Sequence, residues 1–263
     1  MFDRADRRAG RRRFLALSVA LLLLLPWMQS AVMADTEDVQ YTLPEGYDMT
    51  VASATEESAL IWSILMENIG NPYGVAGIMG NLSVESGLRA NNLQDVYTAF
   101  TDNGYTSVVD GGAYSRNRFI NDEYGYGLAQ WTHYSFKKEL YDYVKARGYS
   151  IGNAAAQTEY LLHSLKQPYY ASLLSELQNA GSVSEATLAF LLRYERPAEQ
   201  GLPARLHRTV EALRYFSMYA KETVPVSGEL TKAYTTVAKH GIFGNRYVDP
   251  ENVPGVFVAL FRR

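Results

Sequence analysis

The most informative stretch of the chain is residues 73–88, YGVAGIMGNLSVESGL, which has the pattern of a buried helix that ends beside a carboxylate. The apolar stripe of this helix consists of Val75, Ile78, Met79 and Leu82. At ~100° per residue, Glu85 falls only ~20° from Ile78 around the helix axis. Gly87 follows, and a glycine in this position can end a helix. The pattern therefore predicts an acidic side chain on the buried face of a helix, close to its C-terminal end.

Two interpretations of Glu85 are open from this segment alone. Burial disfavours the ionised form of a carboxyl group, so the pKa of Glu85 should rise, and a carboxylic acid that keeps its proton near neutral pH can act as a general acid. Alternatively, a glutamate on an apolar helix face pairs with an arginine or a helix N-terminus and has only a structural role.

Residues 1–34 have the pattern of an export signal. Six arginines precede a mostly apolar run that begins at Phe14, and small residues surround Ala34. This order predicts a signal peptide with cleavage after Ala34, and Arg12 belongs to a stretch that also fits a twin-arginine signal. The alternative is an uncleaved membrane anchor, because residues 14–34 approach the ~20 positions that a membrane helix needs. Pro26 and Gln29 favour cleavage.

Either form of this segment leaves the rest of the chain outside the cytoplasm, because the arginines stay inside. We expect an extracellular or cell-wall-associated protein, or one that is anchored in the membrane and faces outward. Without residues 1–34 the chain keeps 19 basic and 26 acidic residues, a net charge of −7, which gives no indication of nucleic-acid binding.

The composition also argues against several kinds of site. The chain has no cysteine, which excludes a disulfide framework, a thiol nucleophile and cysteine-bound metals. Its histidines are far apart and show no metal-binding spacing. No phosphate-binding loop or nucleophile elbow is present. We therefore expect neither a metal nor a cofactor, and the sequence gives no indication of the oligomeric state.

The polar segment 35–54 reads as a linker, residues 55–221 as one helical domain, and residues 222–263 as a tail to which no role is assigned. Within the domain, helical periodicity and capping signals predict the following helices: about 55–70, 73–86, 134–147, 154–166, 169–180, from Ser182 to just before Pro197, and 203–221. From Asn91 to Tyr126, glycines alternate with tyrosines and the helical period is lost, so we expect short strands there. The predicted fold class is α+β and predominantly α, with a small β-insertion after the Glu85 helix.

Three motifs in this order make the chain similar to the phage tail lysozyme family. The first is GIMGN followed by ESG, at 77–87; the second is GYGLAQWT, at 125–132; the third is YERPA, at 194–198. The resemblance extends over about 55–221. It implies a lysozyme-like fold related to goose-type lysozymes and lytic transglycosylases, with peptidoglycan glycan strands as the binding partner. It also implies cleavage of the bond from N-acetylmuramic acid to N-acetylglucosamine, with Glu85 as the general acid.

Other carboxylates have weaker claims to catalysis. Asp122 precedes the second motif and would be placed to orient an attacking water, although an aspartate there also caps turns. Glu195 lies in the third motif, where the neighbouring Arg196 and Pro197 suggest the end of a helix, and we expect it near the substrate. Tyr194 either hydrogen-bonds the acid, as a tyrosine does in the transglycosylases, or packs in the core.

The second motif is suited to binding sugars. Its glycines allow the backbone to approach a ligand, and Gln130 can both donate and accept hydrogen bonds. Tyr126 and Trp131 are expected beside the glycan, although Trp131 is equally compatible with the core. Ser86 is expected to position Glu85.

The reaction product is open at this point. A hydrolase adds water at the anomeric carbon, a lytic transglycosylase lets the muramic acid 6-hydroxyl attack, and a functional Asp122 would favour hydrolysis. A non-catalytic peptidoglycan-binding protein on the same fold is a third alternative, since a fold does not prove an activity.

Overall fold

The computed structural model describes residues 54–198, 200–220, 228–230 and 232–233, so the predicted leader and nearly all of the predicted linker lie outside the described residues. The helices in these residues are α2 (Glu56–Ile69), α3 (Pro72–Ser86), α4 (Asp102–Asp110), α5 (Arg116–Asn121), α6 (Tyr134–Lys145), α7 (Ala154–Leu165), α8 (Ala171–Asn179), α9 (Val183–Phe190) and α10 (Leu202–Tyr219). A single π-helical turn, η1 (Leu191–Glu195), follows α9 directly. In the described stretches no helix is both long and apolar enough to cross a membrane.

The ends of α3 follow from local sequence signals. The side chain of Asn71 accepts hydrogen bonds from the first backbone amides of the helix, and Pro72 occupies the first helical position, where its missing N–H costs nothing. At the other end, Gly87 adopts the left-handed conformation with a φ of 63°, which a glycine reaches without a steric penalty. Glu85 is thereby fixed in the last turn of α3.

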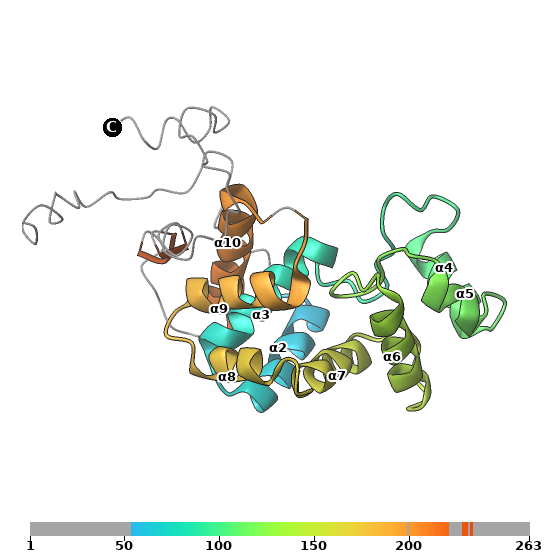
Figure 1. Cartoon of the computed structure of the whole chain (residues 1–263), viewed down its shortest axis with the longest axis horizontal. Coiled ribbons are helices and arrows are strands. Elements are labelled where there is room, and N and C mark those ends of the chain that lie inside the picture. The colour runs from blue at the N-terminus through green and yellow to red at the C-terminus, as the bar shows by residue number, and fades with distance from the viewer. Residues whose placement is uncertain (1–53, 199, 221–227, 231, 234–263) are drawn as a thin grey trace, which may run out of the picture. The chain divides into compact units, whose positions relative to one another are not determined.

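Helix α3 packs against α2, α8, α9 and α10 (Figure 1). Three glycines at intervals of three residues let these helices approach its backbone. A Cβ atom added to Gly74 would lie 2.1 Å from a backbone oxygen of α8, one added to Gly77 would lie 2.6 Å from the backbone of α9, and one added to Gly80 would lie 2.5 Å from the backbone of α10. Each of these distances is shorter than van der Waals contact, so only glycine fits.

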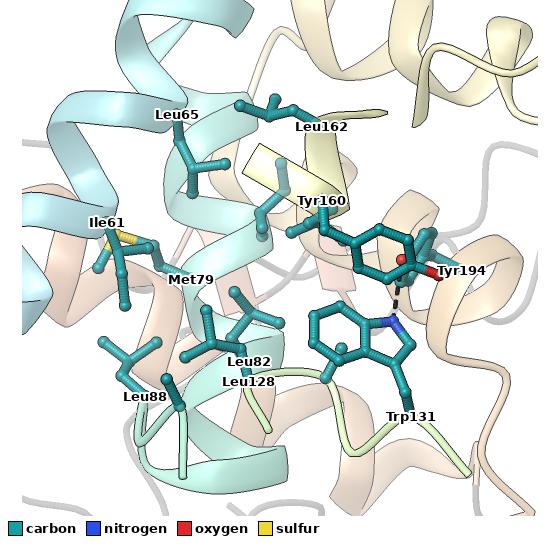
Figure 2. Close-up of a cluster of buried hydrophobic side chains, with 14 of the residues drawn as sticks. Ile61, Leu65, Met79, Leu82, Leu88, Leu128, Trp131, Tyr160, Leu162 and Tyr194 are labelled. Atoms are coloured by element: carbon teal, nitrogen blue, oxygen red, sulfur yellow. Dashed lines mark hydrogen bonds between the residues drawn. The ribbon is translucent and has the colours of Figure 1, made fainter. Parts of the chain in front are cut away.

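Side chains of α3 also link it to its neighbours. Asn81 is fully buried, and its Nδ2 donates to the carbonyl oxygen of Gly77 at 2.8 Å and to that of Thr187, in α9, at 3.0 Å. Around Met79 and Leu82, apolar side chains from α2, α7 and the loop at Leu128 form a continuous buried cluster (Figure 2). The apolar stripe predicted for this helix is therefore at the centre of the core.

The helical part of the sequence prediction is confirmed. Each predicted helix is present, and most of the ends agree to within two residues. The capping serine of α9, Ser182, accepts a hydrogen bond from the backbone amide of Glu185 at 3.2 Å, as its sequence pattern indicates. The helix predicted before Pro197 consists of α9 and the π-helical turn η1. The apolar periodicity of the sequence did not indicate this turn.

The small β-insertion predicted for residues 91–126 is wrong for the described structure. This segment forms the helices α4 and α5, and its only β-type pairing consists of isolated bridges that join Tyr126 to Leu93 and to Trp131. Thr101 and Ser115 cap the two helices with their side-chain oxygens. Of the glycines that suggested turns between strands, Gly104 lies inside α4, and Gly111 and Gly112 follow it, with a φ of 80° at Gly112.

The tyrosines of this segment pack with one another instead of lining strands. Tyr105 is fully buried, with the rings of Tyr114 and Tyr126 at 5.3 and 5.4 Å. Tyr97 stacks on Tyr124 at 3.8 Å. An aromatic cluster therefore supplies the core of this part of the molecule.

Only a few residues of the predicted tail are described, and they contact α9. The carboxylate of Glu229 accepts hydrogen bonds from the backbone N–H and the hydroxyl of Ser184, both at 2.9 Å. A carboxylate at this place satisfies free amides in the first turn of α9 and is favoured by the helix dipole. This part of the tail is thus joined to the domain through the N-terminus of α9.

The glycine contacts of α3 generate a stability prediction. Gly77→Ala should lower the free energy of unfolding by about 1–3 kcal/mol, because the added methyl group overlaps the backbone of α9 and overpacking outweighs the gain in helix propensity. Urea unfolding of the purified chain measures this change.

Gly104→Ala is the matched control. Gly104 also lies in a helix, but a Cβ atom there would approach only the Thr101 hydroxyl, at 3.0 Å. We expect this variant to be as stable as wild type or more stable by up to ~1 kcal/mol. Equal effects of the two substitutions would contradict the packing role of the α3 glycine.

Candidate active site

A groove of about 560 Å³ opens beside the end of α3. Its lining comes from Glu85 in α3, from the loop at 92–96, from the loop at 125–132 and from the turn at 195–198. The groove therefore brings the first, second and third sequence motifs to one place, although Glu85 and Glu195 are 110 positions apart.

Glu85 forms an ion pair with Arg208 of α10, in which Nη2 of the arginine donates to Oε1 of the carboxylate. The side chain of Arg208 is only 7% exposed and that of Glu85 is 19% exposed. The pair is largely shielded from solvent, while Glu85 still reaches the groove. Close packing of α10 on Gly80 brings Arg208 to this position.

Glu195 also lines the groove, and it lies in a strained segment of backbone. It ends the π-helical turn η1, and the next residue, Arg196, is left-handed with a φ of 50°. Such a conformation is costly for a residue other than glycine and is common at functional sites. Pro197 follows and also lines the groove.

The environment of Glu195 favours its protonated form. Its Oε1 is buried and receives no hydrogen bond from the described residues. Burial is the main cause that raises the pKa of Glu195 well above the ordinary value, the negative charge of Glu85 raises it further, and the positive charge of Arg208 opposes both. Two of the carboxylates that line the groove, Glu85 and Glu195, thus have different surroundings.

Gln130 is held at the groove by its own loop. Its backbone is left-handed, with a φ of 45°. Its Nε2 donates to the carbonyl oxygens of Asn92 and Gly127, both at 3.1 Å. Gly125 lies against the side chain, and a Cβ atom there would be 2.8 Å from Oε1 of Gln130. The glycine therefore leaves room for the amide oxygen at the groove.

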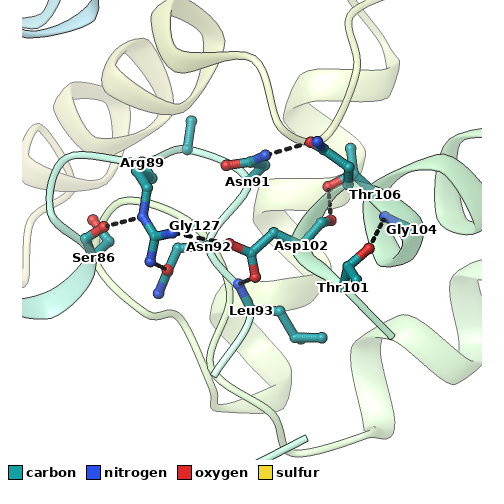
Figure 3. A network of polar contacts seen from close by, with 12 residues as sticks. Ser86, Arg89, Asn91, Asn92, Leu93, Thr101, Asp102, Gly104, Thr106 and Gly127 are labelled. Atoms are coloured by element: carbon teal, nitrogen blue, oxygen red, sulfur yellow. Dashed lines mark hydrogen bonds and ion pairs between the residues drawn. The ribbon is translucent and has the colours of Figure 1, made fainter. Parts of the chain in front are cut away.

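A polar network fixes the loop after α3 (Figure 3). Arg89 donates from Nε to the carbonyl oxygen of Ser86 at 3.2 Å and from Nη1 to Asp102 at 3.2 Å, and its Nη2 donates to the side chain of Asn92. Asp102 also accepts from the backbone amide of Leu93 at 3.2 Å. These contacts hold Asn92 where it lines the groove.

The comparison with family models adds to this geometry. The model of the phage tail lysozyme family matches residues 56–218, which is more than half of the chain. The chain belongs to the phage tail lysozyme family. Membership supports a peptidoglycan-degrading glycosidase in general terms. No curated protein matches the chain significantly.

The remaining residues predicted at the site lie behind the groove. Ser86 is buried, and its hydroxyl donates to the carbonyl oxygens of Leu82 at 3.1 Å and Leu128 at 2.8 Å. It thereby joins the end of α3 to the second motif. This link supports the loop beside Glu85 and uses the hydroxyl proton of Ser86 inside the protein.

The aromatic residues predicted beside the glycan are core residues in this structure. Trp131 is 4% exposed, and its Nε1 donates to the hydroxyl of Tyr194 at 3.2 Å (Figure 2). Tyr194 also shares a hydrogen bond with Ser164 at 2.9 Å. Tyr126 is fully buried, and its hydroxyl lies 2.6 Å from that of Thr106. None of the three aromatic residues belongs to the groove lining.

Asp122 lies outside the groove lining, in a buried ion pair with Lys137. The side chain of Asp122 is 6% exposed and that of Lys137 is not exposed. The hydroxyls of Tyr105 and Tyr114 also donate to this carboxylate, the second at 3.1 Å. Its oxygens are occupied by these partners, which is the arrangement of a structural carboxylate and not of one that orients water.

Sequence reasoning missed Arg208, because no local pattern links it to Glu85 across 123 positions. It also gave no role to Asp95 and Thr132, which line the groove. Thr132 could have been noticed as the last residue of the second motif, whereas Asp95 lies between the first two motifs and carries no such signal. Within the described ranges, no group of three or more histidine, aspartate or glutamate side chains is arranged to hold a metal ion.

The buried ion pair generates a second prediction. Asp122→Asn should lower the free energy of unfolding by about 3–5 kcal/mol, because it leaves the buried ammonium of Lys137 without its counter-charge. Thermal unfolding at pH 7 measures the loss. Below the unfolding transition, the variant should cleave peptidoglycan at the wild-type rate.

The control is Asp142→Asn, which breaks exposed ion pairs with Arg116 and Lys138. Surface pairs contribute ~1 kcal/mol or less, so this variant should remain close to wild type. A folded Asp122→Asn variant that has lost its activity would restore Asp122 as a catalytic candidate.

Proposed function

We propose that the protein cleaves peptidoglycan glycan strands at the bond from N-acetylmuramic acid to N-acetylglucosamine, with Glu85 as the general acid. The observation that carries this proposal is the position of Glu85, in a groove to which all three sequence motifs contribute and which lies within the region matched by the phage tail lysozyme family. The chemistry requires a carboxyl group that gives a proton to the leaving oxygen of the glycosidic bond.

The lining of the groove suits a chain of amino sugars. Asn92, Gln94 and Gln130 contribute amide groups and Thr132 contributes a hydroxyl. Together these groups supply acceptors, such as Oε1 of Gln130, as well as donors, so they match the hydroxyl and acetamide groups of the substrate. No described aromatic ring lines the groove, so we assign sugar binding to these polar groups.

Arg208 has a role in the proposed step. When Glu85 gives its proton to the glycosidic oxygen, it becomes a carboxylate in a largely shielded site. The guanidinium of Arg208, already in contact with Oε1, stabilises that new charge. The positive charge that develops on the sugar ring in the transition state is in turn favoured by the carboxylates of the groove.

Lytic transglycosylase activity is the second candidate function. The position of Asp122 supports it. The aspartate that would have oriented an attacking water is occupied by Lys137 outside the groove lining. Internal attack by the muramic acid 6-hydroxyl needs no such water. Mass spectrometry of the products separates the two reactions, because hydrolysis adds a water of ~18 Da to each cleaved bond and internal attack does not.

We further propose that the protein acts outside the cytoplasm. The arginine-rich and apolar segment 1–34 supports export, with cleavage after Ala34 or retention as an anchor as the two alternatives. The proposed substrate is found outside the cytoplasmic membrane, in agreement with such a signal.

Glu85→Gln tests the function directly. The amide keeps the shape of the side chain but supplies no acidic proton, so release of soluble fragments from purified peptidoglycan should fall about 10²–10⁴-fold. The variant should remain folded, because Glu195 can give up its proton once Glu85 is neutral and then supply the counter-charge for Arg208. Circular dichroism checks the fold.

Glu211→Gln is the matched control. Glu211 is also a partly buried glutamate that pairs with an arginine of α10, but it does not line the groove. This control should retain activity. Wild-type lysis by Glu85→Gln would end the assignment of Glu85, and a wild-type protein that binds peptidoglycan without cleaving it would favour the non-catalytic alternative.

A further inference from the structure

We propose that Glu195 and Glu85 act as a coupled pair of carboxylates that holds one proton in the groove, and that Glu195 sets the pH range in which Glu85 can serve as an acid. This inference rests on the proposed function. It assigns to Glu195 the role of a positioning residue for the catalytic proton, whereas the sequence suggested only a place near the substrate.

The first argument is the number of charges. Glu85 and Glu195 both line the groove, and Arg208 is the one cation that acts on Glu195 within the described residues. Nη2 of Arg208 is committed to Glu85. Two carboxylates with one shielded guanidinium carry an excess negative charge, and a single bound proton removes it.

The second argument is the missing donor at Glu195. Its Oε1 is buried and no hydrogen bond reaches it. An ionised carboxylate in such a position loses its hydration without compensation, whereas a protonated one loses much less. The proton of the pair is therefore expected on Glu195 in the absence of substrate.

The third argument is that the backbone holds Glu195 in place. The π-helical turn η1 and the left-handed Arg196 direct the chain toward the groove, and Pro197 restricts the next residue. Arg196 is anchored in turn, because its Nη1 donates to the hydroxyl of Tyr169 at 3.1 Å. Relaxation of Glu195 into solvent would require this turn to change.

The charged and titratable groups around Glu195 are consistent with one proton shared between Glu195 and Glu85. Glu85 approaches from α3 and Arg208 from α10. Tyr170, next to α8, and Tyr194, in the same turn, also lie within the electrostatic reach of Glu195. Burial raises the pKa of both phenols, so both are neutral in the range where carboxyl groups titrate. Coupling is thus confined to the two carboxylates and the arginine.

The proposed step moves a single proton. Glu195 passes it to Glu85, and Glu85 passes it to the glycosidic oxygen as the bond to the anomeric carbon breaks. The pair regains a proton from the attacking water or from the attacking 6-hydroxyl. Activity is lost at the pH at which the pair gives up its last proton, and the burial of Glu195 together with the negative charge of Glu85 pushes that pH upward.

Glu195→Gln in the full-length chain tests this. We expect the alkaline fall of kcat/KM on purified peptidoglycan to move to lower pH by about one unit or more, because the amide cannot hold the proton of the pair. The rate at pH 5 should stay within about tenfold of wild type. A merely structural role would lower the rate equally at every pH, and an alkaline fall that does not move overturns the proposal.

Asp95→Asn is the control for the loss of a carboxylate from the same groove. Asp95 lines the groove but is exposed, so solvent screens its charge. Whatever its effect on KM, this variant should leave the pH of the alkaline fall in place. An equal shift in both variants would show that the general charge of the groove, and not the pair, sets the profile.

Thermal unfolding separates failure of this inference from failure of the proposed function. The pKa of Glu195 is raised on folding, so its contribution to stability is complete below the unfolded pKa and is lost as the pH rises through the folded one. Glu195→Gln should therefore melt like wild type at pH 4 and at a higher temperature at pH 8. A lower melting temperature at both pH values overturns the coupled pair, even if the wild type proves not to cleave peptidoglycan.

Discussion

Close contact between α3 and its neighbours is the constraint on which the site depends. Gly74, Gly77 and Gly80 remove the side chains that would keep α8, α9 and α10 away. Because α10 touches the backbone at Gly80, Arg208 reaches the carboxylate that lies one turn further along α3. The close approach of α10 to α3 therefore determines both the packing of the core and the ion pair at the groove.

The two glutamates of the groove have opposite electrostatic environments. Glu85 receives a guanidinium, whereas Glu195 has a buried oxygen that receives no donor. A protein that needed only stability would satisfy both groups, since an unpaired buried polar atom is costly. The left-handed Arg196 adds strain at the same place. Unsatisfied and strained groups that meet in one groove are typical of a functional site.

Most of the helices and the family could be predicted from the sequence, because apolar periodicity and caps such as Asn71 and Ser182 are local signals. Residues 91–126 misled the prediction, since alternating glycine and tyrosine are compatible with strands as well as with short helices around an aromatic cluster. An arginine partner for Glu85 was one of the interpretations open from the sequence, but neither Arg208 nor the Lys137 partner of Asp122 could be identified, because these residues become neighbours only through tertiary packing. Trp131 resembled a sugar platform, but its ring and Nε1 are used inside the core.

The fixed amide of Gln130 has a consequence for selectivity. Both hydrogen bonds of its Nε2 go to carbonyl oxygens of its own neighbourhood, so the side chain meets a ligand with its oxygen alone. An amide whose nitrogen is occupied can only accept hydrogen bonds, so it recognises only groups that donate one. Under the proposed function, we expect this point of the groove to favour a sugar that offers an N–H or O–H over one that offers only a lone pair.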